Sequence, residues 1–243
     1  MESKLVHSMR LPVSLCGEDA KLSYTGLVTL FMDIASEHGE DLGLGRKDLL
    51  EKGLFWIVSK TKVKIYALPE MLEPVTLCTW PEAPGRIRCN RYYTLSSQEK
   101  ILAEGKNEWA MLEAETGRPH KIDGLYPENF EHCNDLVCDT PFTKISEDFS
   151  EFRKIKTHTV TSADIDGSHH MNNLAFLRAA FGIYSCKELS EMKVDEIEIS
   201  YRAQCYEGEN LEIKERVLEN SRQIAILKED KKAAAVINIS FKD

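Results

Sequence analysis

The sequence of 243 residues has no uninterrupted apolar run of about 18 residues, the length that an α-helix needs to cross a membrane. Its first ten residues, Met1 to Arg10, contain no apolar core of signal-peptide length. We therefore expect no integral membrane association and a cytoplasmic location.

The sequence also lacks CxxC pairs, although it contains seven cysteines. An odd number of cysteines without an export signal indicates a reducing compartment rather than a disulfide framework. Cys133 and Cys138 lie near His132, but their spacing fits no common zinc site. We expect neither a metal ion nor a cofactor.

Positive charge is in deficit, with 31 Lys and Arg against 40 Asp and Glu and a formal net charge of −9. This balance counts against nucleic acid as a partner. It would also repel an acidic protein at long range, so binding one would require a local basic patch. The densest positive set consists of Lys60, Lys62, Lys64, Arg86, Arg88 and Arg91.

The same order of elements occurs twice along the chain: a strand, a helix, and then several antiparallel strands. In the first run, residues 4–15 alternate like a strand, and a helix with an apolar stripe follows Ser23 and ends at Gly43 and Gly45. Its later strands are predicted at residues 55–66, 75–80, 86–96 and 101–112. The second run is predicted to have strands at residues 157–163, 194–204, 210–219 and 222–241, with a helix from Met171.

Residues 126–153 separate the two runs and are acidic and irregular in composition. Pro127 and Pro141 argue against a continuous helix or strand there. We interpret this stretch as a linker between an N-terminal domain at residues 1–125 and a C-terminal domain at residues 154–243.

The most polar short stretch, residues 164–173, lies at the entrance of the second helix. It contains two carboxylates, a hydroxyl, two imidazoles and two amides. Leu174, Leu177, Phe181 and Tyr184 then recur at helical spacing, so Asn172 or Asn173 can cap the first turn. The free N–H groups of a helix N-terminus can hold an oxygen that gains negative charge, which suits acyl transfer.

This stretch resembles the second-half motif of the acyl-ACP thioesterases, approximately Asp-x-Asn-x-His-Val-Asn-Asn. Asp166, His170, Asn172 and Asn173 match it, whereas Ser168 stands at the Asn position and Met171 at the Val position. A Glu-Cys pair of the family falls at Gln204 and Cys205. Other segments resemble the family in the same order: Gly43-Leu44-Gly45, Thr79-Trp80-Pro81, Arg91-Tyr92-Tyr93, Glu108-Trp109 and Thr116-Gly117-Arg118-Pro119.

The resemblance implies an α+β fold, a tandem (double) hotdog with two long central helices, each wrapped by an antiparallel sheet. It also implies a hydrolase of fatty acid biosynthesis that cleaves fatty acyl-acyl carrier protein, with the active site in the C-terminal half and the acyl carrier protein as partner. An acyl-CoA thioesterase remains an alternative, and Ser168 and Gln204 also allow a non-catalytic acyl-binding protein. Whether the chain forms a homodimer is left open.

The resemblance assigns the catalytic set Asp166, Ser168, His170, Gln204 and Cys205, with Asn172 and Asn173 at the oxyanion site. Either water activated by Asp166 or His170, or the thiol of Cys205, could be the nucleophile. We favour water, because Cys205 follows a strand and has no helix N-terminus of its own to stabilise a thiolate.

Six apolar residues are candidates to line a tunnel for the acyl chain, although they fit an ordinary hydrophobic core equally well: Leu27, Leu30, Phe31, Ile34, Trp56 and Val58. Candidates to contact the carrier protein are Arg86, Arg88 and Arg91.

Overall fold

A computed structural model describes residues 3–145 and 147–242. It divides into two compact units, one of residues 1–16 with 20–140 and one of residues 17–19 with 141–243. We call them the N-terminal unit and the C-terminal unit. Among the described residues, no helix combines the length and the apolar character required to cross a membrane.

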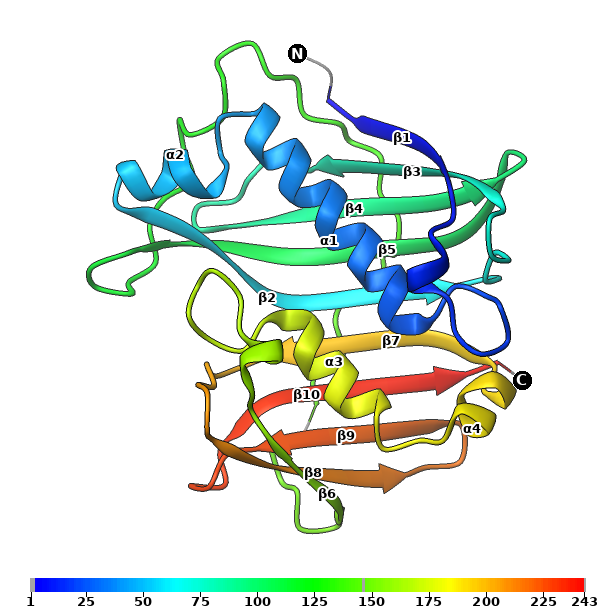
Figure 1. The fold of residues 1–243 in the computed structure, drawn as a ribbon. Coiled ribbons are helices and arrows are strands. Elements are labelled where there is room, and N and C mark those ends of the chain that lie inside the picture. The colour runs from blue at the N-terminus through cyan, green and yellow to red at the C-terminus, as the bar shows by residue number, and fades with distance from the viewer. Residues whose placement is uncertain (1–2, 146, 243) are drawn as a thin grey trace. The chain divides into compact units, whose positions relative to one another are not determined.

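The N-terminal unit contains an antiparallel sheet with strand order β1-β3-β4-β5-β2 (Figure 1). Its strands are β1 (Leu5–Arg10), β2 (Leu54–Ile65), β3 (Pro74–Pro81), β4 (Arg88–Ser97) and β5 (Lys100–Glu113). The predicted strand at residues 4–15 is shorter than expected, because β1 stops before Pro12 and a 3-10 turn occupies Val13–Leu15.

Helix α1 (Tyr24–Asp41) lies across one face of this sheet (Figure 1). Ser23 caps it by accepting the Gly26 N–H at 3.0 Å. The predicted stripe is buried, and the helix ends before Gly43, whose φ of 66° is readily adopted only by glycine. The short helix α2 (Arg46–Glu51) follows.

Gly105 of β5 lets α1 approach the sheet closely. The Phe31 ring lies over this position and stacks on Tyr93, with ring centroids 4.9 Å apart. A Cβ atom at residue 105 would lie 2.6 Å from the Phe31 ring. Any side chain at this position would therefore force Phe31 away from the sheet.

The C-terminal unit contains an antiparallel sheet with strand order β7-β10-β9-β8-β6. Its strands are β6 (Arg153–Thr159), β7 (Val194–Tyr201), β8 (Asn210–Val217), β9 (Ser221–Leu227) and β10 (Ala233–Phe241). A 3-10 turn at Ser162–Asp164 precedes helix α3 (Asn173–Phe181), and α4 (Cys186–Glu191) follows it.

Helix α3 has nine residues, whereas α1 has 18, so the expectation of two long helices holds only for the first. The C-cap of α3 is Gly182, and the chain turns there instead of continuing to Tyr184. Tyr184 therefore lies outside the helix, and its hydroxyl donates to the Glu215 carboxylate at 2.6 Å.

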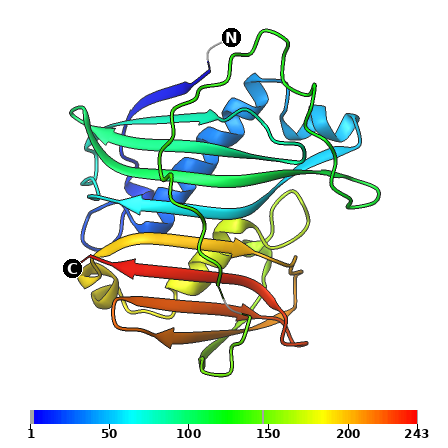
Figure 2. The same cartoon turned by 180° about the vertical axis from the view of Figure 1, so that it is seen from behind.

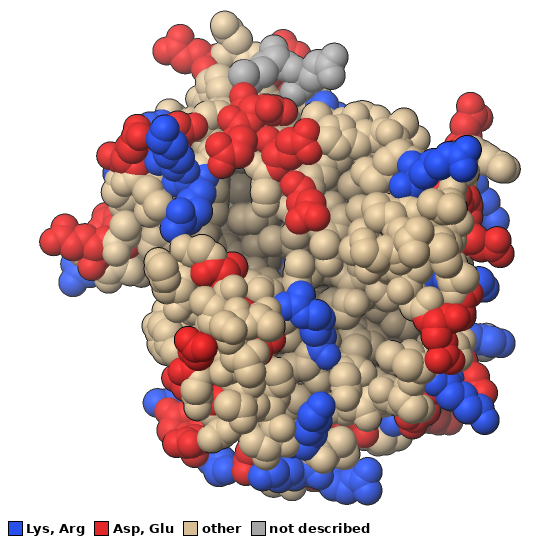
Figure 3. All heavy atoms as spheres, in the orientation of Figure 1, with Lys and Arg blue, Asp and Glu red and all other residues tan. Residues whose placement is uncertain are grey.

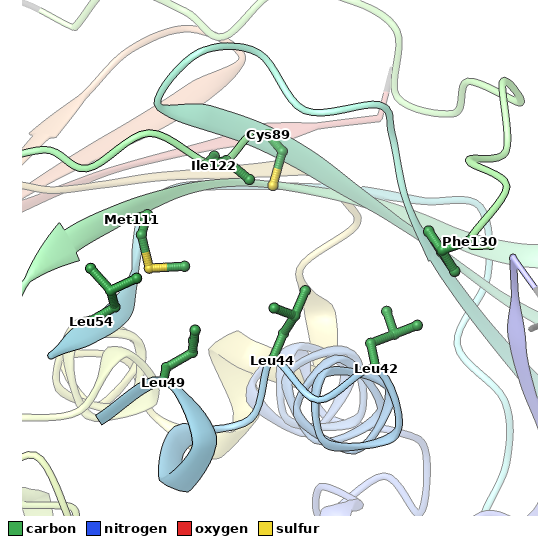
Figure 4. Packing of buried hydrophobic residues seen from close by; sticks show 8 residues of the cluster. All are labelled: Leu42, Leu44, Leu49, Leu54, Cys89, Met111, Ile122 and Phe130. Carbon is green, nitrogen blue, oxygen red and sulfur yellow. The ribbon is translucent and has the colours of Figure 1, made fainter. Parts of the chain in front are cut away.

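Described residues between β5 and β6 form no helix and no strand, but they are not a loose tether. In the N-terminal unit, Phe130 joins a buried cluster with Leu42 and Leu44 (Figure 4). Farther along, the segment crosses the opposite face of the sheet (Figure 2), where Asp135 accepts the Trp80 indole N–H at 2.9 Å. Ile145, Phe149 and Phe152 belong to a core cluster of the C-terminal unit.

Candidate active site

The polar loop before α3 is held by the backbone of Asp164. Its carbonyl oxygen accepts the Asn172 N–H at 2.8 Å and the Asn172 side-chain amide at 2.9 Å. The Asn172 side-chain oxygen in turn accepts the Ala175 N–H at 2.8 Å, which makes Asn172, one of the two predicted candidates, the N-cap. One side chain thus starts the helix and closes the loop.

The backbones of Asp166 and His170 pair across a tight turn. The Asp166 N–H lies 3.4 Å from the His170 carbonyl oxygen, and the Asp166 carboxylate accepts the Ser168 N–H at 2.7 Å. His169, at the corner, has a φ of 64°, a conformation that few residues other than glycine adopt readily. Asp166, Ser168 and His169 are exposed.

The half-buried His170 side chain contacts the backbone of the next residue. Its Nδ1 atom lies 3.3 Å from the Met171 carbonyl oxygen, which can only accept. Nδ1 is therefore the donor in this contact, and in the neutral imidazole Nε2 is the atom that has the free lone pair. A neutral imidazole with a free Nε2 atom can act as a general base.

Two backbone donors are open at the start of α3. The N–H of Asn172 is used by Asp164, whereas no acceptor among the described residues is bonded to the N–H groups of Asn173 and Leu174. First-turn N–H groups have no intrahelical partner, and the helix dipole favours negative charge there. The sequence predicted Asn172 and Asn173 for this role, but the Asn172 N–H is already bonded to Asp164. Leu174, whose contribution comes from its backbone alone, was missed.

Cys205 meets the loop through its backbone. Its carbonyl oxygen accepts the Met171 N–H at 2.8 Å, which joins the two motif segments. Its thiol is fully buried, and burial raises the thiol pKa to about 11. Gln204 is exposed, and its side-chain oxygen accepts the Tyr206 hydroxyl at 2.8 Å. Strand β7 ends at Tyr201, so Gln204 and Cys205 lie outside the regular strand, and the first side chain is exposed whereas the second is buried.

The loop is also held by a pair of side chains that the sequence did not predict, His158 and Asp164. The Asp164 carboxylate binds the His158 Nε2 atom at 3.1 Å and accepts the N–H and hydroxyl of Thr161 at 3.0 and 3.1 Å. Burial alone would raise the pKa of this carboxyl, but its bonds to Thr161 and its interaction with His158 outweigh burial and lower it. The Thr161-x-x-Asp164 spacing of a capping box was the available signal.

In the N-terminal unit, the predicted acyl-lining residues Leu27, Leu30, Phe31, Ile34 and Val58 are buried, and Trp56 is half-buried. Trp56 packs edge-on against Trp109, with ring centroids 6.2 Å apart.

The predicted carrier-binding arginines do not form one surface. Arg86 and Arg88 are exposed, but Arg91 is only 7% exposed and faces α1, where its guanidinium lies 3.0 Å from the His38 Nδ1 atom. The assignment of Arg91 to a carrier surface is therefore wrong. Alternation along β4 places Arg88 and Arg91, three residues apart, on opposite faces of the sheet.

The chain matches two family models, the acyl-ACP thioesterase N-terminal domain over residues 2–128 and the acyl-ACP thioesterase C-terminal domain over residues 147–242. It therefore belongs to the acyl-ACP thioesterase family.

Among curated relatives, it is 20% identical over 196 residues to the chloroplastic oleoyl-acyl carrier protein thioesterase of Coriandrum sativum, covering 74% of this chain and 53% of the relative. It is 22% identical over 202 residues to the chloroplastic palmitoyl-acyl carrier protein thioesterase of Gossypium hirsutum, covering 78% and 49%. The chain thus spans about half the length of these relatives.

Two solved structures have similar folds. An acyl-ACP thioesterase from Bacteroides thetaiotaomicron has a TM-score of 0.83 at 19% identity, covering 99% of this chain and 98% of that one. The 12:0-ACP thioesterase from Umbellularia californica has a TM-score of 0.83 at 16% identity, covering 100% and 98%. At these identities the likeness concerns the fold alone.

Proposed function

We propose that the chain hydrolyses the thioester of fatty acyl-acyl carrier protein and releases the free fatty acid and the carrier in the cytoplasm. The observation that carries the proposal is the loop before α3, where a histidine with a free Nε2 atom precedes two open helix N–H groups. Membership of the family supplies the substrate class. We also assign each unit to the hotdog fold, and keep the domain boundaries 1–125 and 154–243 as a prediction.

In the mechanism that we infer, the Nε2 atom of His170 takes a proton from water as the hydroxide adds to the thioester carbonyl. The N–H groups of Asn173 and Leu174 donate to the oxyanion. The intermediate then expels the thiolate, which takes the proton back from His170. In this mechanism the Asp166 carboxylate stabilises the positive charge that the imidazole gains in the transition state, and Ser168 contributes its hydroxyl to the same loop.

The activity is tested by incubating the protein with acyl-ACP and acyl-CoA of several chain lengths and measuring free thiol. Faster release from acyl-ACP is expected. A preference for acyl-CoA would indicate the alternative thioesterase, whereas binding of thioesters without any release would indicate an acyl-binding protein.

Cys205 is expected to be dispensable as a nucleophile, because its thiol is buried and its pKa is raised to about 11. Cys205→Ala should retain activity within about tenfold, with the loss coming from a small cavity. Mass spectrometry during turnover should detect no acylated protein. In the native protein at pH 8, iodoacetamide should modify the exposed Cys186 well before Cys205. An acyl group trapped on Cys205 would contradict the water mechanism.

Carrier binding is expected to depend on Arg86 more than on Arg88. The Arg88 guanidinium lies 3.1 Å from the Glu108 carboxylate, which already offsets its charge. On the face shown in Figure 3, acidic side chains gather near the end of α1 where Glu37, Glu40 and Asp41 are exposed. An acidic carrier should avoid that region.

Arg86→Glu should therefore raise KM for acyl-ACP several-fold, with Arg88→Gln having a smaller effect, while small thioesters are unaffected. The matched control is Lys100→Glu, a charge reversal at the opposite end of the β4–β5 hairpin. Equal effects of Arg86→Glu on large and small substrates would mean that Arg86 is structural.

A further inference from the structure

A row of polar side chains crosses the face of the N-terminal sheet that packs against α1. Arg91 of β4 lies opposite Asn107 of β5, which in turn lies opposite Thr61 of β2. Such partners project to one face, and the contacts of Arg91 with His38 and of Asn107 with Met32 identify it as the face toward α1. All three side chains are buried, with exposures of 7%, 1% and 2%.

Several polar groups of this row lack the partners that burial normally requires. The Thr61 hydroxyl makes no hydrogen bond among the described residues. The Trp109 indole N–H, two residues from Asn107 on the same face, lies near the Tyr93 hydroxyl but not in hydrogen-bonding geometry, and that hydroxyl already accepts the Asn107 amide at 3.1 Å. Arg91 donates to His38 at 3.0 Å and to Thr79 at 3.4 Å. Within residues 3–145 and 147–242, however, no carboxylate pairs with its guanidinium. An isolated buried cation is strongly disfavoured.

The chemistry of these groups defines what would satisfy them. Guanidinium and indole N–H groups can only donate, so their missing partner is an acceptor oxygen. The surface is hollowed between α1 and α2, at the end of α1 that carries His38 (Figure 3). Along the same helix face, buried apolar residues such as Leu30 and Ile34 suit the hydrocarbon part of an acyl chain.

We propose that the N-terminal unit selects acyl chains that carry an oxygen substituent remote from the thioester, which accepts hydrogen bonds from Arg91 and Trp109. This inference rests on the proposed function and specifies its substrate class. A plain alkyl chain would leave the buried donors unpaired, whereas a hydroxyl or carboxylate oxygen would satisfy them.

The test compares kcat/KM for three acyl-ACP substrates of one chain length: an unsubstituted chain, a chain with a distal hydroxyl and a chain with a terminal carboxylate. At least about a tenfold preference for one oxygenated chain is expected, and the two arms identify which oxygen is recognised. Arg91→Met or Trp109→Phe should reduce the preference to less than about threefold. Arg118→Met, an exposed arginine of the same unit, is the matched control and should retain it.

Binding of the corresponding free fatty acids, followed by the shift in Tm, separates this inference from hydrolysis. If no thioester is cleaved, the proposed function fails, but tighter binding of the oxygenated acid would still support the polar site. Trp109→Phe also serves if Arg91→Met does not fold. Equal affinity of the native protein for plain and oxygenated chains would overturn the inference, as would a preference that survives both substitutions.

Discussion

Replacing His170 by asparagine is expected to lower kcat by at least about 100-fold, the usual effect of losing a general base. Within the described part of the chain the imidazole makes one hydrogen bond, to a backbone carbonyl, so the free energy of unfolding should change by less than about 1 kcal/mol. Steady-state hydrolysis of acyl-ACP and thermal melting measure the two effects separately.

The neighbouring imidazole provides a matched control. His169→Asn makes the same chemical change one residue earlier, and asparagine tolerates the φ of 64° found there. Activity should be retained in this variant. If both substitutions were equally damaging, the effect would belong to the shape of the loop rather than to a base at position 170.

Asp166→Asn is the second substitution expected to have a large effect, again about 100-fold or more on kcat. The asparagine oxygen can still accept the Ser168 N–H that the carboxylate binds at 2.7 Å, so the turn should persist. The variant therefore removes the negative charge without removing the hydrogen bond. KM should change much less than kcat, because the charge matters mainly when the imidazole becomes protonated.

Asp148→Asn is a suitable reference for this experiment. The Asp148 carboxylate also accepts a backbone N–H two residues later, from Ser150 at 2.9 Å, but it lies outside the polar loop. Its substitution should leave kcat unchanged. Full activity in the Asp166→Asn enzyme would remove this carboxylate from the mechanism.

The sequence predicted the helix entrance well because its signals are local. A side chain that caps a helix bonds within three residues of its own position, so spacing alone narrowed the cap to Asn172 or Asn173, and the bond to the Ala175 N–H identifies Asn172. The open N–H of Leu174 belongs to the backbone, so the type of side chain at this position does not reveal it. It became apparent only when the bonds of Asn172, Asp164 and Cys205 had accounted for the neighbouring donors.

Arg91 shows where prediction from the sequence failed. A cluster of arginines suggests an exposed patch, but the face to which each one projects depends on strand register. The pairing of Arg91 with Asn107, and the contact of Arg91 with His38, are long-range facts that periodicity cannot supply. The length of α3 was overestimated for a similar reason, because the apolar spacing continued to Tyr184 although Gly182 ends the helix.

The irregular segment between β5 and β6 bears on how the chain could be divided experimentally. A fragment that stopped at residue 125 would lose Phe130 from the cluster that it forms with Leu42 and Leu44, and one that began at residue 154 would lose Phe149 and Phe152. Each would expose apolar surface that the intact chain covers, which favours aggregation. Fragments intended to fold alone should therefore be separated near Thr140 and Pro141, so that each keeps the aromatic side chains of its own core.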